Sequence, residues 1–280
     1  MTAPPVSASF PWPQGRRAAV AVTFDLDAES VMLAIDPAYA ERPSLMSHQR
    51  YGPVTGVPRL LEVLAERGVR ATFFVPGASA ERHPAAVEAI VAAGHEIGHH
   101  GYEHESLLGR SREEELDILR RGLDALERIG GVRPRGYRAP WWELGTHTLE
   151  LLAELGFAYD SSLFERDVPY RIPTAHGELI EVPVSWTFDD WERYAFWPEI
   201  TGSGTIARPS EVLESWWEEI EALAEVGGCA VLTMHPFLSG RPARARALGV
   251  LLDRLRERGD LWIATCGEIA EHAAGVPTAP

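Results

Sequence analysis

Apolar runs of strand length alternate with helical segments along most of this chain of 280 residues. The strand-like runs cover residues 17–27, 69–75, 96–100, 136–141, 157–163, 178–186, 229–234 and 261–265. Segments with a helical apolar period cover 57–67, 84–93, 113–129, 149–155, 210–226 and 243–258. Alternation at this spacing predicts an α/β fold in which crossover helices join parallel strands. About seven parallel strands in one chain favour a (β/α) barrel over an open sheet.

Capping residues and prolines add boundaries to this pattern. Ser111 followed by Glu114 is a capping box and predicts that a helix begins there. Residues 28–56 contain Pro37, Pro43 and Pro53 and have no clear period, so we expect a long active-site loop. Residues 1–15 are predicted to be a Pro-rich arm of a single catalytic domain that spans 1–280.

The charge of the chain excludes some partners. Its formal net charge is −15, which disfavours nucleic acid and anionic membranes, because binding phosphates requires clustered Lys and Arg. No apolar run approaches the roughly 18 residues of a membrane helix. The N-terminus lacks a basic segment followed by an apolar one, so we expect no signal peptide and a cytoplasmic enzyme. Cys229 and Cys266 are expected to be buried, reduced thiols.

Four of the ten histidines lie within residues 94–104, where two metal-site patterns overlap. His95-Glu96-x-x-His99 matches the zinc-protease motif, which requires both histidines on one face of a helix. Three glycines in the same segment oppose that helix, since each costs about 1 kcal/mol relative to alanine. We therefore expect supporting roles for His95 and His99 and favour the second pattern, His100-x-x-x-His104.

The pair His100 and His104 needs no helix, although a structural role in the core would explain two histidines equally well. Asp25 and Asp27 strengthen the metal interpretation, because they follow an apolar strand and point the same way. In a parallel barrel, side chains at the carboxyl ends of the strands line the active site. Two more strand ends carry polar residues, Arg138 and His235. Convergence of these strand ends is difficult to explain by packing.

Five short motifs occur in a fixed order along the chain. They are Thr23-Phe24-Asp25-x-Asp27, His100-x-x-x-His104, Arg138-Ala139-Pro140-Trp141, Asp160-Ser161-Ser162-Leu163 and Thr233-Met234-His235-Pro236. Together they resemble the polysaccharide deacetylase superfamily, the NodB homology domain. The resemblance covers residues 20–269 and implies a distorted (β/α) barrel with hydrolytic activity on non-peptide C–N bonds.

The same resemblance implies a role for each candidate site residue. Three residues would bind a divalent metal, for which zinc is expected: Asp27, His100 and His104. Asp25 would be the general base that activates the attacking water, and Arg138 would orient and charge-stabilise Asp25. His235 would protonate the departing nitrogen. A metal that polarises the amide and an acid–base pair that moves protons form a coherent mechanism.

Other stretches are similar to one branch of the superfamily. They are Asp27-Ala28-Glu29-Ser30, residues 138–143, Ser185-Trp186-x-x-Asp189-Asp190 and Met234-His235-Pro236-x-x-x-Gly240-Arg241-Pro242. This branch contains intracellular peptidoglycan-deacetylase-like proteins, cyclic imide hydrolases and metal-independent allantoinases. The substrate could therefore be an N-acetylated sugar or a cyclic imide or ureide ring. Several members are tetramers, so a homo-oligomer is expected.

Aromatic residues are frequent in two of the loops. The tryptophans at 141, 142, 186, 191 and 197 could wall a small pocket or stack on sugar rings, or they could be core and interface residues. A non-catalytic carbohydrate-binding module is the alternative to an enzyme. Asp25, Arg138 and His235 together favour the enzyme, because a binding module needs no acid–base pair.

Overall fold

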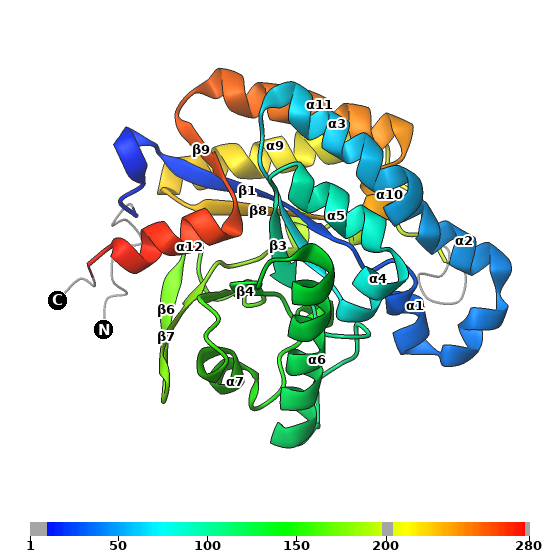
Figure 1. Cartoon of the computed structure of the whole chain (residues 1–280). Helices are drawn as coiled ribbons and strands as arrows, with labels where there is room; N and C mark the ends of the chain where they lie inside the picture. The colour runs from blue at the N-terminus through cyan, green and yellow to red at the C-terminus, as the bar shows by residue number, and fades with distance from the viewer. Residues whose placement is uncertain (1–9, 198–203, 278–280) are drawn as a thin grey trace.

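The structure is a computed structural model that describes residues 10–197 and 204–277. In these residues nine strands form one sheet in the order β6-β7-β5-β4-β3-β2-β1-β8, with β9 beside β1 (Figure 1). The strands are β1 (Ala18–Asp25), β2 (Thr72–Val75), β3 (Glu96–His99), β4 (Gly136–Tyr137), β5 (Tyr159–Asp160), β6 (Tyr170–Thr174), β7 (Gly177–Glu181), β8 (Cys229–Met234) and β9 (Leu261–Ala264). All pairings are parallel except that of β6 with β7. The predicted barrel-like α/β fold is confirmed.

Helices cover the outside of the curled sheet. They are α1 (Ser30–Ile35), α2 (Pro43–Tyr51), α3 (Val57–Arg67), α4 (Gly77–Arg82), α5 (Pro84–Ala92), α6 (Arg112–Gly130), α7 (Thr148–Glu154), α8 (Trp191–Tyr194), α9 (Pro209–Val226), α10 (Pro236–Ser239), α11 (Pro242–Arg258) and α12 (Cys266–Gly275). Short helical turns are η1 (Pro13–Gly15), η2 (Pro37–Glu41), η3 (Gly52–Gly56), η4 (Pro140–Trp142) and η5 (Trp186–Phe188). Figure 1 shows α3, α9 and α11 along one side of β1 and β8.

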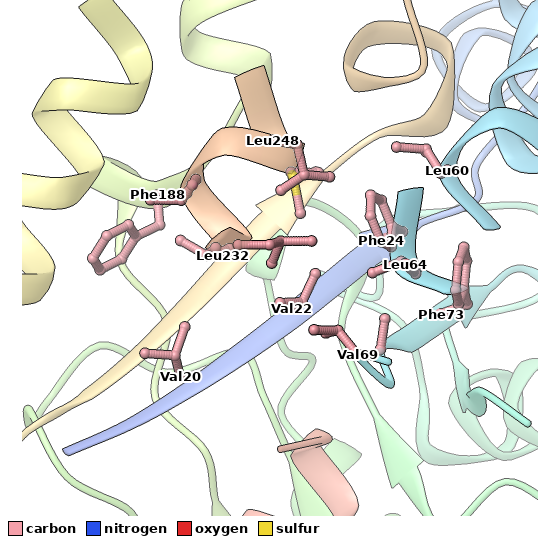
Figure 2. Packing of buried hydrophobic residues seen from close by; sticks show 14 of the residues in the cluster. Val20, Val22, Phe24, Leu60, Leu64, Val69, Phe73, Phe188, Leu232 and Leu248 are labelled. Carbon is pink, nitrogen blue, oxygen red and sulfur yellow. The ribbon is translucent and has the colours of Figure 1, made fainter. Parts of the chain in front are cut away.

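The central strand β1 is buried along its whole length, and its two faces differ. Val20, Val22 and Phe24 pack with Leu60 of α3 and with Leu248 of α11 in the main core (Figure 2). The alternating residues on the other face are small, and they belong to a second cluster inside the barrel. The inner face of β1 therefore leaves room for polar side chains at its carboxyl end.

Residues 28–56 are not the irregular loop that we expected, because α1, η2, α2 and η3 occupy most of the segment. Its three prolines stand in the first turns of η2, α2 and η3. A proline there loses no intrahelical hydrogen bond, so these residues begin helices and do not prevent them. The prediction also missed α4, β6 and α12.

The predicted capping box is present at the start of α6. Ser111 Oγ accepts a hydrogen bond from Glu114 N, and the Glu114 carboxylate accepts one from Ser111 N. Both cysteines are buried free thiols, as expected.

The predicted Pro-rich arm over 1–15 lies mostly outside the described residues. Trp12, at its end, is buried and donates a hydrogen bond to Gly227 O at 2.8 Å. The described part of the chain contains no helix that is long and apolar enough to cross a membrane.

The barrel is not closed. In the described sheet, β8 and β6 are the two ends of the strand order. Residues 182–190 follow β7 and lead across the gap to β8, where Asp189 forms one parallel bridge with Thr233. This gap is called the seam below.

Candidate active site

The carboxyl ends of the parallel strands surround a cavity of about 110 Å³. Five of the six residues predicted from the sequence line this cavity: Asp25, Asp27, His100, His104 and His235. The sixth, Arg138, is fully buried directly behind Asp25. Residues that are up to 210 positions apart in the sequence, from Asp25 to His235, thus meet at the carboxyl ends of the strands.

Arg138 holds Asp25 in place. Its Nη1 donates to Asp25 Oδ1 and to Thr23 Oγ1, each at 2.8 Å. The rest of the guanidinium donates to Ser161 O at 3.2 Å and to Ser161 Oγ at 3.1 Å, and it lies over the ring of Phe74. Asp25 Oδ2 takes no part in this pairing and lies 3.8 Å from His100 Nε2. One carboxylate oxygen is thus fixed, while the other faces His100.

Three buried side chains converge beside Asp25. Asp27 Oδ1 lies 3.5 Å from His100 Nε2, and Asp27 Oδ2 lies 3.6 Å from His104 Nε2. His100 Nδ1 donates to the backbone oxygen of Arg138 at 2.7 Å, which leaves the Nε2 lone pair directed at the cluster. A ligating histidine commonly uses its other nitrogen in this way. The ligand atoms of Asp27, His100 and His104 all lie within 4.8 Å of one another.

The electrostatics of this cluster suit a cation. Burial lowers the pKa of His100 to about 3 and that of His104 well below its usual value, so both imidazoles are neutral and able to ligate. Burial raises the pKa of Asp27 to about 7, despite the opposing charge of His235. No described residue donates a hydrogen bond to Asp27 Oδ1. A buried carboxylate oxygen without a hydrogen-bond donor suits a bound divalent metal. Asp27, His100 and His104 therefore fit such an ion.

His235 lies on the same cavity and is paired with a second carboxylate. Its Nδ1 hydrogen bonds to Asp190 Oδ1 at 2.7 Å, and its Nε2 lies 3.6 Å from Asp27 Oδ2. Burial would lower the pKa of His235, but the hydrogen bond and charge of Asp190, with the charges of Asp189 and Asp27, raise it to about 10. The ring therefore carries a proton at neutral pH.

Sequence reasoning assigned no role to Asp189 and Asp190. Asp190 also accepts hydrogen bonds from the backbone N of His235 at 3.0 Å and from Ser239 Oγ. Asp189 lines the cavity, and burial raises its pKa to about 7. The available signal was the pair of consecutive aspartates after an aromatic segment. The two aspartates and His235 could themselves ligate a cation, but Nδ1 of His235 is already used by Asp190.

Strained backbone is concentrated at the cavity. The described non-glycine residues with positive φ are Ala28 (49°), His104 (63°), Trp141 (59°) and Trp142 (54°). Three of them line the cavity, and Ala28 follows Asp27 directly. Each such conformation costs about 1–3 kcal/mol and persists where the surroundings impose it.

Tryptophans form the walls of the cavity. The ring of Trp141 lies 4.9 Å from that of His104 and 6.2 Å from that of Trp191. Trp142 lies 4.5 Å from Trp186. The left-handed backbone at 141 and 142 thus aims two consecutive indoles at the same opening. Trp197 lies outside this wall, in a small cluster with residues of α1 and α2.

The protease pattern has no structural basis. His99 lies on β3 with His95 just before it, so the segment is extended and not helical. His95 Nδ1 accepts a hydrogen bond from Ala71 N at 3.1 Å. His99 is fully buried, and its two ring nitrogens contact Leu119 O and Gly101 N. Both histidines support the fold, as predicted.

The sequence and the fold are similar to those of known proteins. The sequence profile of the polysaccharide deacetylase family matches residues 14–159. The peptidoglycan deacetylase of Helicobacter pylori is 30% identical, over 90% of this chain and 94% of that protein. A Mycobacterium smegmatis protein, provisionally named a polysaccharide deacetylase, has a crystal structure 50% identical in sequence, with a TM-score of 0.94 over 98% of both chains. The Puue allantoinase structure has the same fold, at 22% identity and a TM-score of 0.82 over 98% of this chain and 96% of that one.

Proposed function

Because the chain belongs to the polysaccharide deacetylase family, a family of hydrolases of non-peptide C–N bonds, we propose that it removes the acetyl group from an N-acetylated sugar with the aid of a divalent metal. The observation that carries this proposal is the meeting of three groups in one cavity. A candidate metal triad, an arginine-held carboxylate and a protonated histidine all lie within reach of one substrate. The names of the relatives support the sugar as substrate.

The triad of Asp27, His100 and His104 would hold the ion. One carboxylate and two neutral imidazoles with room for water suit zinc. A bound divalent ion would polarise the amide carbonyl and lower the pKa of water.

The remaining residues handle the protons. Asp25 accepts a proton from the attacking water as the water oxygen bonds to the amide carbon, and Arg138 keeps this carboxylate oriented. His235 then gives its proton to the amide nitrogen as the C–N bond breaks. The products are acetate and a free amine. Asp190 keeps His235 protonated between turnovers.

Opening of a cyclic imide or ureide ring is the second candidate, because it breaks the same kind of bond with the same acid and base. The small, tryptophan-walled cavity favours a compact substrate. Among the described residues that line it, none is Lys or Arg, so no such side chain is available to pair with an anionic substituent of the substrate. The fold shared with an allantoinase supports this candidate too.

A substrate panel with a metal assay tests both candidates. Protein purified without chelator is expected to contain one zinc ion per chain and to release acetate from N-acetylglucosamine oligomers. His100→Ala is expected to lose the metal and at least about 100-fold of the activity. His95→Ala is the matched control and should keep both, because His95 precedes β3 and does not line the cavity. Hydrolysis of hydantoin, succinimide or allantoin without any acetate release from the sugars would mean that the substrate is a cyclic imide or ureide and not an N-acetylated sugar. Metal-free protein with full activity would refute the metal mechanism.

A further inference from the structure

We propose that Phe164, the outer face of Trp186 and the cavity at the seam form a second substrate subsite, which holds a neighbouring pyranose ring of an oligosaccharide. This inference rests on the proposed function in one respect, namely that the substrate is a sugar. It adds that the substrate has at least two rings and that the second ring lies outside the catalytic cavity.

The first observation is an exposed aromatic stack. Phe164 is 44% exposed and Trp186 is 50% exposed. Their rings lie 5.8 Å apart at an interplanar angle of 20°, and Trp142 closes the group at 4.5 Å from Trp186 and 5.4 Å from Phe164. Exposed aromatic rings held by one another present a fixed apolar surface. Such a surface fits the C–H face of a pyranose ring, which is flat and apolar.

The second observation is a separate cavity of about 220 Å³ under this stack. Phe164, Trp186 and the hydroxyl residues Ser185 and Thr187 line it. Charged side chains line it as well, namely Arg166, Asp167 and Glu219. Aromatic rings beside several donors and acceptors match a sugar, which has an apolar face and a rim of hydroxyl groups.

The topology explains why a cavity exists at this place. In a closed barrel, β8 would pair with the next strand and side chains would fill the interface. Here the segment after β7 meets β8 through the single bridge of Asp189 with Thr233. Val184, Phe188 and Val231 are among the apolar residues that line the gap that remains.

The seam cavity shares one lining residue with the catalytic cavity. Trp186 lines both, and the strained Trp142 packs on Trp186 from the catalytic side. A substrate whose N-acetyl group reaches Asp25 can therefore extend across Trp186 onto Phe164. A second protein chain fits this surface less well, because a stable interface buries about 800 Å² on each partner, far more than one aromatic stack offers.

The test compares binding of N-acetylglucosamine and of its β-1,4-linked trimer by calorimetry. The metal-loaded Asp25→Asn protein is used so that the ligand is not consumed. Phe164→Ala in this background should weaken trimer binding roughly tenfold and leave binding of the monosaccharide unchanged. Phe164→Tyr, which keeps a ring, should restore trimer binding. Phe196→Ala is the matched control, because Phe196 is 42% exposed and lines neither cavity.

The outcomes separate the subsite from the proposed function. Acetate release from the sugars by the unmodified enzyme decides the function, whereas the ratio of trimer to monosaccharide affinity decides the subsite. An equal ratio in Phe164→Ala and Phe196→Ala would overturn the subsite, as would a protein that binds neither sugar. The ratio of trimer to monosaccharide affinity could be unchanged in Phe164→Ala while ultracentrifugation shows a smaller oligomer. This result would overturn the subsite and assign the aromatic stack to contact between copies of this chain. If Phe164→Ala does not fold, Phe164→Leu and Phe164→Tyr are compared instead. Equal affinity of these two variants for the trimer would also overturn the subsite.

Discussion

At the scale of single residues, the protonation of His235 depends on the carboxylate next to it. Burial alone would leave this imidazole neutral, as it leaves His100 and His104 neutral. The contact with Asp190 at 2.7 Å reverses the effect and raises the pKa of His235 to about 10. The difference in pKa thereby separates the candidate metal ligands His100 and His104 from His235, the candidate proton donor.

Asp190→Asn is expected to move the alkaline limb of the pH profile of kcat/KM to lower pH by at least about one unit. The donor must be protonated, so activity is present below the pKa of His235 and is lost as the pH rises through it. Removing the charge of Asp190 lowers that pKa while the amide oxygen keeps the hydrogen bond. Ser239→Ala removes a neutral partner of Asp190 and should shift the limb less. An unmoved limb in Asp190→Asn would show that His235 is not the group observed.

At the scale of elements, α6 and β3 meet at a glycine. A Cβ on Gly122 would lie 2.2 Å from His99 Nε2 and 2.8 Å from Gly101 O. His99 is fully buried and immediately precedes His100, so the strand cannot retreat without moving a candidate ligand. The close approach of helix and strand thus depends on the missing side chain.

Gly122→Ala is therefore expected to lower the free energy of unfolding by about 2–3 kcal/mol and to weaken metal binding. Gly130→Ala in the same helix is the control, since the nearest atoms to its Cβ would belong to Val87, Val132 and Val91, at 3.4 Å or more. The control should be neutral or slightly stabilising, because alanine has the higher helix propensity. Urea denaturation of both variants measures the difference. Equal effects would refute the packing argument.

Strands β5 and β7 are joined by two fully buried acids, Asp160 and Glu181, which are direct partners in the register. Asp160 Oδ2 and Glu181 Oε2 are buried and have no hydrogen-bond donor among the described residues, so we expect these two neighbouring acids to share a proton. Burial raises the pKa of Asp160 to about 6 and raises that of Glu181 well above its usual value. The pair also holds the active-site strand end, because Asp160 accepts from Ser162 Oγ, and this oxygen accepts from the backbone N of Ala139.

The shared proton predicts how stability depends on pH. Both acids have a raised pKa in the folded state, so their contribution is complete at low pH and falls as the pH rises from about 3.8 through about 6 and beyond. Asp160→Asn and Glu181→Gln each keep one donor between the groups and should flatten this decline. The double variant places two NH₂ groups face to face and should lose about 1–3 kcal/mol. Additive, pH-independent effects in urea unfolding at pH 5 and pH 8 would argue against the shared proton.

At the scale of the whole molecule, a bound ion should stabilise the fold. Its ligands come from the segments that follow β1 and β3, so the unfolded chain offers no equivalent site. Removal of the metal with a chelator is expected to lower the midpoint of thermal unfolding by roughly 5–10 °C. The variant His100→Ala/His104→Ala should start at the lower midpoint and not respond to the chelator. A similar response in both proteins would mean that the stabilising ion lies elsewhere.

The sequence predicted the fold class and the strand-end residues, because period-2 and helical patterns are local and carboxyl ends of parallel strands meet by topology. Asp25 and His235 could be placed together for this reason. Asp190 could not, because its partner is chosen by the course of the chain through the seam. The helices in 28–56 were missed because prolines were interpreted as loop formers, although each stands in a first helical turn. The open seam has no sequence signal, since it is a pairing that does not form.

Both described ends of the chain lie on the flank where the strands begin (Figure 1). Pro11 O accepts a hydrogen bond from His272 Nε2 at 2.7 Å, and β1 begins beside β9. The catalytic cavity opens at the other ends of the same strands. A short linker between the two ends would therefore give a circular permutant, with new termini cut into an exposed turn such as the one around Gly131. A carrier protein or a solid support attached on this flank would leave the path to the cavity open.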